Sequence, residues 1–197
     1  MAGARRCQGQ PNINAMLICI FRYLLSRSVV LLQSGLLLVG LSAGSWAATA
    51  NLAPGLSLTL PEPLAVRVVE LEEKEGELIL VGEIEERESY FMAALKIGAW
   101  ERNHVLWRRL EDAIRKRSDS GNFVTGVRGS FTTAEGEGVW YTLYEYESNE
   151  RPLRQIYYLL KSDQSAYWIT LTVVEGVDVA LVLPVVRALI RRVQLAP

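Results

Sequence analysis

The sequence predicts an α+β fold: a largely antiparallel β-sheet with a middle helix and a C-terminal helix packed on it. Three observations predict this class. Half of the 197 residues are hydrophobic and 22% are charged, which is a globular composition. Short segments with alternating apolar residues are separated by brief polar turns, which is typical of antiparallel strands. Two longer segments repeat their apolar residues every three or four positions, as one face of a helix does.

The first 50 residues have the layout of a secretory signal peptide. Two arginines come first, an apolar run follows at 29–41, and small residues close it. The triplets at 45–47 and 48–50 both fit a small-x-small cleavage site. We therefore expect an exported, periplasmic protein that is cleaved near Ala47–Ala50. Met16 is the more ordinary start, and the residues before it are read as an N-terminal extension.

An uncleaved membrane anchor is the alternative interpretation of this leader. A helical span needs about 20 apolar residues, and the apolar run is interrupted by polar ones. Both cysteines, Cys7 and Cys19, lie in the leader, so the mature domain is expected to have no thiol chemistry. Without residues 1–50 the chain has 17 basic and 22 acidic residues, a net charge of −5. This charge argues against binding to nucleic acid, because phosphate contacts need many cations.

After the leader, we expect a linker at 51–56 with a turn at Pro54-Gly55, and then a single domain at 57–197. The first part of this domain is rich in β-branched residues and partly alternating. A turn of sequence EKEG joins two of its segments as a hairpin. The predicted strands of this part are Ser57–Leu60, Ala65–Glu72, Glu77–Ile84 and Tyr90–Gly98.

The middle helix is predicted after Trp100. Its apolar residues recur at helical spacing, and three basic residues, 115–117, occupy its last turn, where the helix dipole favours cations. The apolar face consists of Leu106, Trp107, Leu110, Ala113 and Ile114.

The second half is predicted to form a meander that is closed by a helix. Its strands are Gly129–Thr133, Gly138–Glu147, Arg154–Lys161 and Ala166–Val174. Pro184 suits the first turn of the last helix, since no N–H is needed there. One face of this helix is apolar from Val185 to Val193. Arg187, Arg191 and Arg192 line the other, where they are either solvated or meet anionic lipid or an acidic partner.

The segments "GVWYTLYEYE", "RPLRQIYYLLKSDQSAYWITLTV" and "LPVVRALIRRVQL" resemble the end of PsbP-like domains. The resemblance covers about residues 138–195. It implies an antiparallel sheet between helical layers, a PsbP-like α/β sandwich. Members of that family include photosystem accessory subunits, a nuclear import cofactor and bacterial secreted proteins, and most are non-enzymatic. The resemblance therefore implies a binding or accessory module.

The sequence contains no recognisable catalytic set, metal site or cofactor motif. His104 is the only histidine, so a zinc site lacks ligands and a catalytic triad has one candidate base. Glu145 and Glu147 lie about 7 Å apart on one strand face, which suggests a carboxylate-dependent hydrolase as a distant alternative. A solvated strand end is the simpler interpretation.

Aromatic residues in three neighbouring strands are the best candidate for a binding surface, because aromatic side chains with polar tips suit interfaces. Those that lie beneath helices would instead be core. The predicted binding residues are Trp140, Tyr144, Tyr146, Arg154 and Trp168. We thus expect a non-enzymatic module that binds a protein or small ligand in the cell envelope, without a cofactor. A membrane-anchored accessory protein is the second hypothesis.

Overall fold

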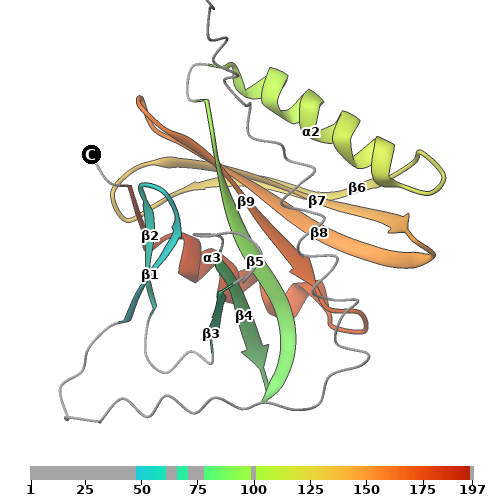
Figure 1. Ribbon diagram of the computed structural model, residues 1–197, viewed down its shortest axis with the longest axis horizontal. Helices are drawn as coiled ribbons and strands as arrows, with labels where there is room; N and C mark the ends of the chain where they lie inside the picture. The colour runs from blue at the N-terminus through green and yellow to red at the C-terminus, as the bar shows by residue number, and fades with distance from the viewer. Residues whose placement is uncertain (1–47, 61–65, 71–77, 99–100, 196–197) are drawn as a thin grey trace, which may run out of the picture.

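A computed structural model describes residues 48–60, 66–70, 78–98 and 101–195 of the chain, which form sheet flanked by two helices (Figure 1). The predicted extension, Met16 and the apolar leader run lie outside the described residues. Within this part of the chain, no helix has both the length and the apolar character that a membrane crossing requires.

The main sheet has seven strands in the order β3-β4-β5-β9-β8-β7-β6, and every neighbouring pair is antiparallel. The prediction of a largely antiparallel sheet is confirmed. The strands are β3 (Val66–Glu70), β4 (Leu78–Ile84), β5 (Arg87–Ile97), β6 (Val124–Thr132), β7 (Gly138–Ser148), β8 (Arg151–Lys161) and β9 (Ala166–Val173).

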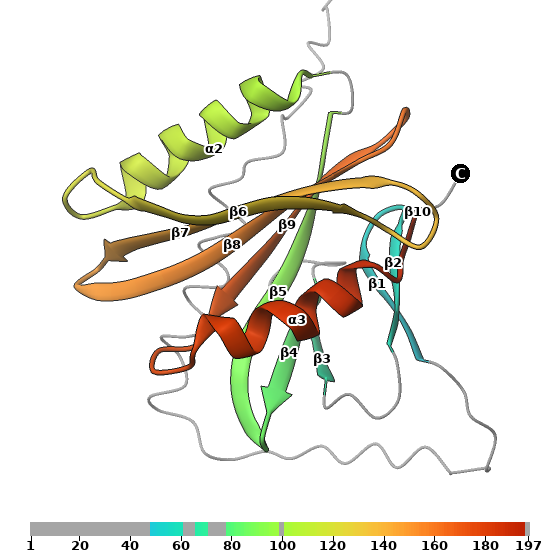
Figure 2. The ribbon, with the colours of Figure 1, turned by 180° about the vertical axis from the view of Figure 1, so that it is seen from behind.

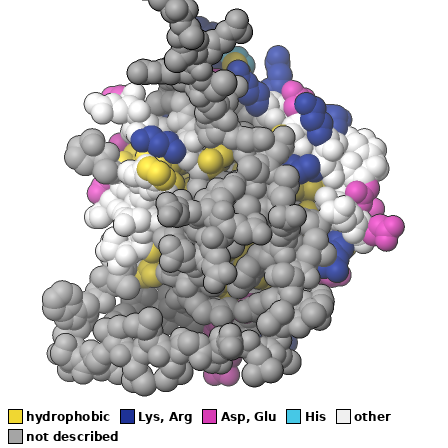
Figure 3. Space-filling view, viewed as in Figure 1, with side chains coloured by type: hydrophobic (Ala, Val, Ile, Leu, Met, Phe, Trp, Pro, Cys, Tyr) yellow, Lys and Arg dark blue, Asp and Glu magenta, His cyan; other side chains and the backbone are white. Residues whose placement is uncertain are grey.

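Helix α2 (Asn103–Arg117) covers one face of this sheet (Figure 1). Its buried residues Leu106, Leu110 and Ile114 recur every fourth position, so they face the sheet together. The opposite face of the helix is basic, and Lys and Arg side chains gather over it in the space-filling view (Figure 3). The predicted amphipathic helix is confirmed, with its start three residues after Trp100.

Helix α3 (Val179–Ile190) covers the other face of the sheet (Figure 2). Val182, Val186, Leu189 and Ile190 are its buried residues. The prediction that Pro184 starts this helix is wrong, because Pro184 lies inside it. The helix starts earlier because the Asp178 side chain caps it, accepting a hydrogen bond from the Ala180 amide at 2.9 Å.

A second, three-stranded sheet joins the two ends of the described chain. It has the order β1-β2-β10, formed by β1 (Ala48–Ala53), β2 (Leu56–Leu60) and β10 (Val193–Leu195). The linker predicted at 51–56 is instead the end of β1, a turn at Pro54-Gly55 and the first residue of β2. Leu52, Leu56 and Leu58 are at most 1% exposed, and this burial holds the segment against the core. Val193, predicted on the last helix, belongs to β10.

Strand β6 is longer than the predicted strand at 129–133. It forms one edge of the main sheet, and most of its side chains are exposed. An exposed edge strand has no buried face to impose alternation, so its first half carries no signal in the sequence. A register shift between Thr125 and Arg128 interrupts its pairing with β7. This edge, together with α3, forms the pocket described below.

Candidate ligand-binding site beneath helix α3

Most of the aromatic residues predicted to bind a ligand are core residues under α2. Tyr144, Tyr146 and Trp168 are 1%, 7% and 2% exposed, and they pack with the apolar face of α2. They do not form an open surface, because the helix covers the sheet at this point. Only Trp140 is exposed, at 37%. Arg154 lies opposite Glu145 in the β7–β8 register and is partly buried.

The hydroxyl groups of the buried tyrosines under α2 are satisfied. Tyr144 donates to Glu111 Oε1 at 3.0 Å. Tyr146 and Tyr157 both donate to Gln155 Oε1, at 2.6 and 2.7 Å. Burial raises the pKa of all three tyrosines, and the Glu111 hydrogen bond adds to the effect on the pKa of Tyr144. These hydroxyls therefore stay neutral and serve the structure of the core.

A hollow of about 440 Å³ lies between α2 and the β6–β7 edge. The exposed His104 lines this hollow together with basic residues and the acidic Glu111. The Glu111 carboxylate already accepts a hydrogen bond from the Tyr144 hydroxyl. Glu145 and Glu147 are exposed at the strand end. Across the described residues, no group of three His, Cys, Asp or Glu side chains is arranged to hold a metal ion.

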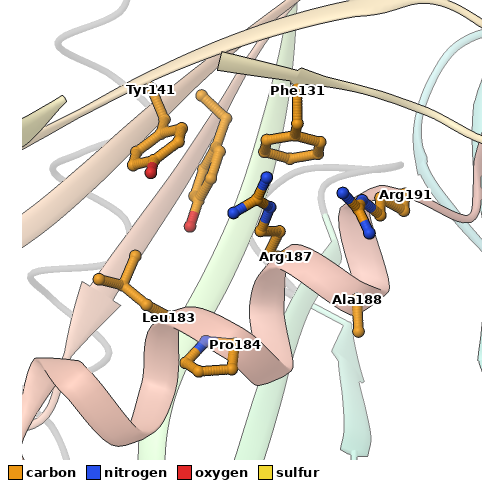
Figure 4. A pocket seen from close by; sticks show the side chains of 8 residues that line it. Phe131, Tyr141, Leu183, Pro184, Arg187, Ala188 and Arg191 are labelled. Carbon is orange, nitrogen blue, oxygen red and sulfur yellow. The ribbon is translucent and has the colours of Figure 1, made fainter. Parts of the chain in front are cut away.

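A cavity of about 470 Å³ lies on the opposite face of the sheet, beneath α3 (Figure 4). We call it the α3 pocket. Strands β6, β7 and β8 each supply one aromatic ring; α3 supplies apolar residues and Arg187, and its C-cap residue is Arg191. The residues that line it are Phe131, Tyr141, Tyr158, Leu183, Pro184, Arg187, Ala188 and Arg191.

The three rings of the α3 pocket form one cluster. The ring centroids of Tyr141 and Tyr158 are 5.6 Å apart, and those of Phe131 lie 6.1 and 6.4 Å from them. Gly129 on β6 makes room for the Tyr141 ring, since a Cβ at Gly129 would lie 2.6 Å from the Tyr141 hydroxyl oxygen. The rings provide a rigid apolar wall for the pocket.

Arg187 and Arg191 both lie against the Phe131 ring of this wall. The guanidinium carbons of Arg187 and Arg191 lie 5.1 and 5.8 Å from the Phe131 ring centroid, within the range of a cation–π contact (Figure 4). No carboxylate lines the pocket. In the part of the chain that the structure describes, neither arginine forms an ion pair. Among the described residues, the positive charge of the α3 pocket therefore has no carboxylate partner.

The hydroxyl of Tyr158 has no hydrogen-bond partner among the described residues, although the side chain is only 1% exposed. Burial raises the pKa of Tyr158, the nearby Tyr141 adds to the rise, and Arg187 opposes it. The group is therefore a neutral O–H donor at physiological pH. A buried donor without an acceptor is uncommon in native proteins.

Local patterns contained part of the information about this site. Tyr141 and Tyr144 are three positions apart on one strand, so strand geometry puts them on opposite faces, and the last helix was predicted to have a basic face. The missing step was the contact between Phe131 and Arg187, which lie far apart in the chain and meet only because α3 crosses that end of the sheet.

The fold and the pocket together define an α+β sandwich with a candidate ligand-binding site under one helix. No protein-family model and no curated protein matches the sequence. Among solved structures, the chain is similar to cyanobacterial PsbP (CyanoP) from Synechocystis sp. PCC 6803, with a TM-score of 0.49 and 9% identity over 80% of this chain and 98% of that one.

Two further structures are similar at this level. LpqN of Mycobacterium tuberculosis, described as involved in cell envelope biogenesis, has a TM-score of 0.49 and 10% identity, covering 79% of this chain and 88% of that one. PA94 of Pseudomonas aeruginosa, a protein of unknown function and putative regulator, has a TM-score of 0.41 and 14% identity, covering 76% and 96%. These likenesses concern the fold alone.

Proposed function

We propose that the protein is an exported, non-enzymatic binding module that holds a small organic ligand in the α3 pocket. The observation that carries the proposal is the unpartnered Tyr158 hydroxyl at the wall of this cavity. Leaving a buried donor unpaired costs about 1–3 kcal/mol. A ligand that supplies an acceptor removes this cost.

The size of the α3 pocket supports a small ligand. Sites for small molecules commonly have volumes of about 300–1,000 Å³ and are mostly apolar with a few placed polar groups. The α3 pocket, at about 470 Å³, fits this description, because its three rings, Leu183, Pro184 and Ala188 are accompanied by only two tyrosine hydroxyls and two guanidinium groups.

The chemistry of the lining supports binding rather than catalysis. The lining contains no carboxylate, histidine, serine, threonine, cysteine or lysine. Its titratable groups are tyrosine hydroxyls and guanidinium groups, and a buried tyrosine with a raised pKa is a poor base or nucleophile at neutral pH. The pocket thus offers recognition without the groups that most hydrolytic mechanisms need.

Export rests on the leader. Its basic start, apolar run and small-residue end are the features of a signal peptide. A membrane-held form, with the leader retained, would place the same pocket in the same compartment.

The test uses protein expressed with its own leader and purified from the cell envelope. N-phenylnaphthylamine, an uncharged fluorescent aromatic probe, is titrated into it. We expect saturable binding of one probe per chain. Ala188→Trp, which puts a bulky indole on a residue that lines the pocket, should weaken this binding by about tenfold or more.

Leu181→Trp is the matched control, because Leu181 is 53% exposed on the same helix and does not line the pocket. This variant should bind the probe like the original protein. The proposal fails if the probe shows no saturable binding, or if both tryptophan variants bind it equally well.

A further inference from the structure

The structure assigns a ligand class to the α3 pocket: an amphipathic organic anion, with a carboxylate, sulfonate or phosphate group on an apolar body. This inference rests on the proposed function, because it concerns the same pocket. Beyond the proposed function, it specifies the charge of the ligand, the residues that bind the charged group, and the position of the ligand in the pocket.

The positive charge of the pocket is the first argument. Arg187 and Arg191 both lie against the ring of Phe131, so two like charges share one side of the cavity. Like charges at close range repel each other, and the described residues provide no carboxylate to offset them. An anion between the two guanidinium groups would turn this repulsion into two attractions.

The geometry of arginine is the second argument. A guanidinium group that rests on an aromatic ring keeps its N–H donors in its own plane, where they can reach a carboxylate or phosphate in a bidentate manner. Phe131 thus orients Arg187 and Arg191 without using up their donors. Both arginines are exposed, so an anion from solution can reach them.

The position of the second donor is the third argument. Tyr158 and Arg187 both line the α3 pocket, and the positive charge of Arg187 opposes the rise in the pKa of the Tyr158 hydroxyl. We call the anionic group of the ligand its head. One oxygen of this head, or a polar atom next to it, can therefore accept a hydrogen bond from the Tyr158 hydroxyl while the head contacts Arg187. The body of the ligand then lies against Tyr141, Leu183 and Pro184.

The surroundings of the arginine pair show how the head is reached. A second hollow of about 390 Å³ is lined by Ser130, Thr132 and Trp140 among others, and it shares Phe131, Arg187 and Arg191 with the α3 pocket. The arginine–phenylalanine stack therefore forms a wall between two hollows. The head of the ligand sits at this wall, and its apolar body occupies the larger, aromatic side.

The experiment compares two probes that share one aromatic frame. Anilinonaphthalene sulfonate carries a sulfonate, and N-phenylnaphthylamine lacks it. We expect the protein to bind the sulfonate about tenfold more tightly, because the two guanidinium groups can form charge-assisted hydrogen bonds with the sulfonate that the uncharged probe cannot make. The double variant Arg187→Gln, Arg191→Gln should lose this preference, so that the two probes bind it with similar affinity.

Arg192→Gln is the control, because Arg192 is exposed nearby and lines neither hollow. It should keep the preference for the sulfonate. The inference is overturned if the protein binds both probes equally, or if the double variant still prefers the sulfonate. In either case, saturable binding of the uncharged probe that Ala188→Trp weakens by about tenfold or more would leave the proposed function standing.

A last arm separates a free ligand from a membrane surface. Decanoate, a soluble amphipathic carboxylate, should displace the sulfonate probe, and the purified protein should not sediment with phosphatidylglycerol vesicles. Sedimentation with these vesicles that requires Arg187 and Arg191, without competition by decanoate, would show that the arginines contact a lipid surface and would overturn the inference.

Discussion

Replacing Tyr158 by phenylalanine should stabilise the unliganded protein, which is the reverse of what most substitutions in a core do. The change removes only the hydroxyl, which is buried and has no partner among the described residues. Because an unsatisfied buried hydroxyl costs about 1–3 kcal/mol, we expect the free energy of unfolding to rise by about 1 kcal/mol. For a domain of this size, this raises Tm by roughly 2–4 °C.

Tyr157 provides a matched comparison on the same strand. Its side chain is as buried as that of Tyr158, but it faces α2 and donates a hydrogen bond to Gln155 at 2.7 Å. Tyr157→Phe removes the same atom and a satisfied bond with it, so the free energy of unfolding should fall by about 1 kcal/mol. The two substitutions should therefore shift the stability in opposite directions.

Urea unfolding followed by far-ultraviolet circular dichroism measures both variants, and unchanged m values ensure that the midpoints report stability. The Tyr158→Phe variant should also bind the sulfonate probe about fivefold more weakly, since about 1 kcal/mol of hydrogen bonding to the ligand is lost. If this variant is destabilised as much as Tyr157→Phe, the hydroxyl has a partner in the free protein and the reasoning is refuted.

Two further predictions concern alkaline pH and processing. Burial raises the pKa of five tyrosines, so these side chains stay neutral in the folded protein at a pH at which they ionise in the unfolded chain. The stability that they contribute is present below about pH 10 and should decrease as the pH rises above it, as urea unfolding at several pH values would show. These residues are Tyr90, whose pKa rises to about 12, Tyr144, Tyr146, Tyr157 and Tyr158. Cleavage of the leader should occur after Ala47 and not after Ala50, because Ala48, Thr49 and Ala50 belong to strand β1 and pair with β2. Mass spectrometry of the mature protein should therefore find Ala48 at its N-terminus.

Each of these predictions has a clear contrary result. A free energy of unfolding that stays constant from about pH 8 to 11 would show that the tyrosine hydroxyls ionise equally well in both states. A mature protein that begins at Asn51 would show that β1 does not need its first three residues.

The pattern of the second half of the chain predicted its faces because alternation in a strand is a local property. Tyr144 and Tyr146 share the α2 face, while Tyr141 and Leu143 contribute to the α3 face, as period two requires. The middle helix was equally predictable, since Leu106, Leu110 and Ile114 fall on one stripe. In each case the burial of one side imposes a period on the sequence.

Local patterns failed where the same residues suit two structures. The small residues at 48–53 fit a cleavage site and a linker, yet they also form β1. This strand pairs with β2, and β2 pairs in turn with β10 from the opposite end of the described chain. The prediction that Pro184 starts α3 is wrong because the Asp178 cap, and not the proline, sets the start of the helix.

The sequence by itself determined the fold class, the two amphipathic helices and the absence of a recognisable catalytic motif, because composition and periodicity act over a few neighbouring residues. Only the tertiary structure decided which aromatic rings are core and which line a cavity. It placed Arg187 and Arg191 over Phe131 and left the Tyr158 hydroxyl without a partner among the described residues. These properties depend on contacts between strands and a helix that are distant in the chain, and no local pattern encodes such contacts.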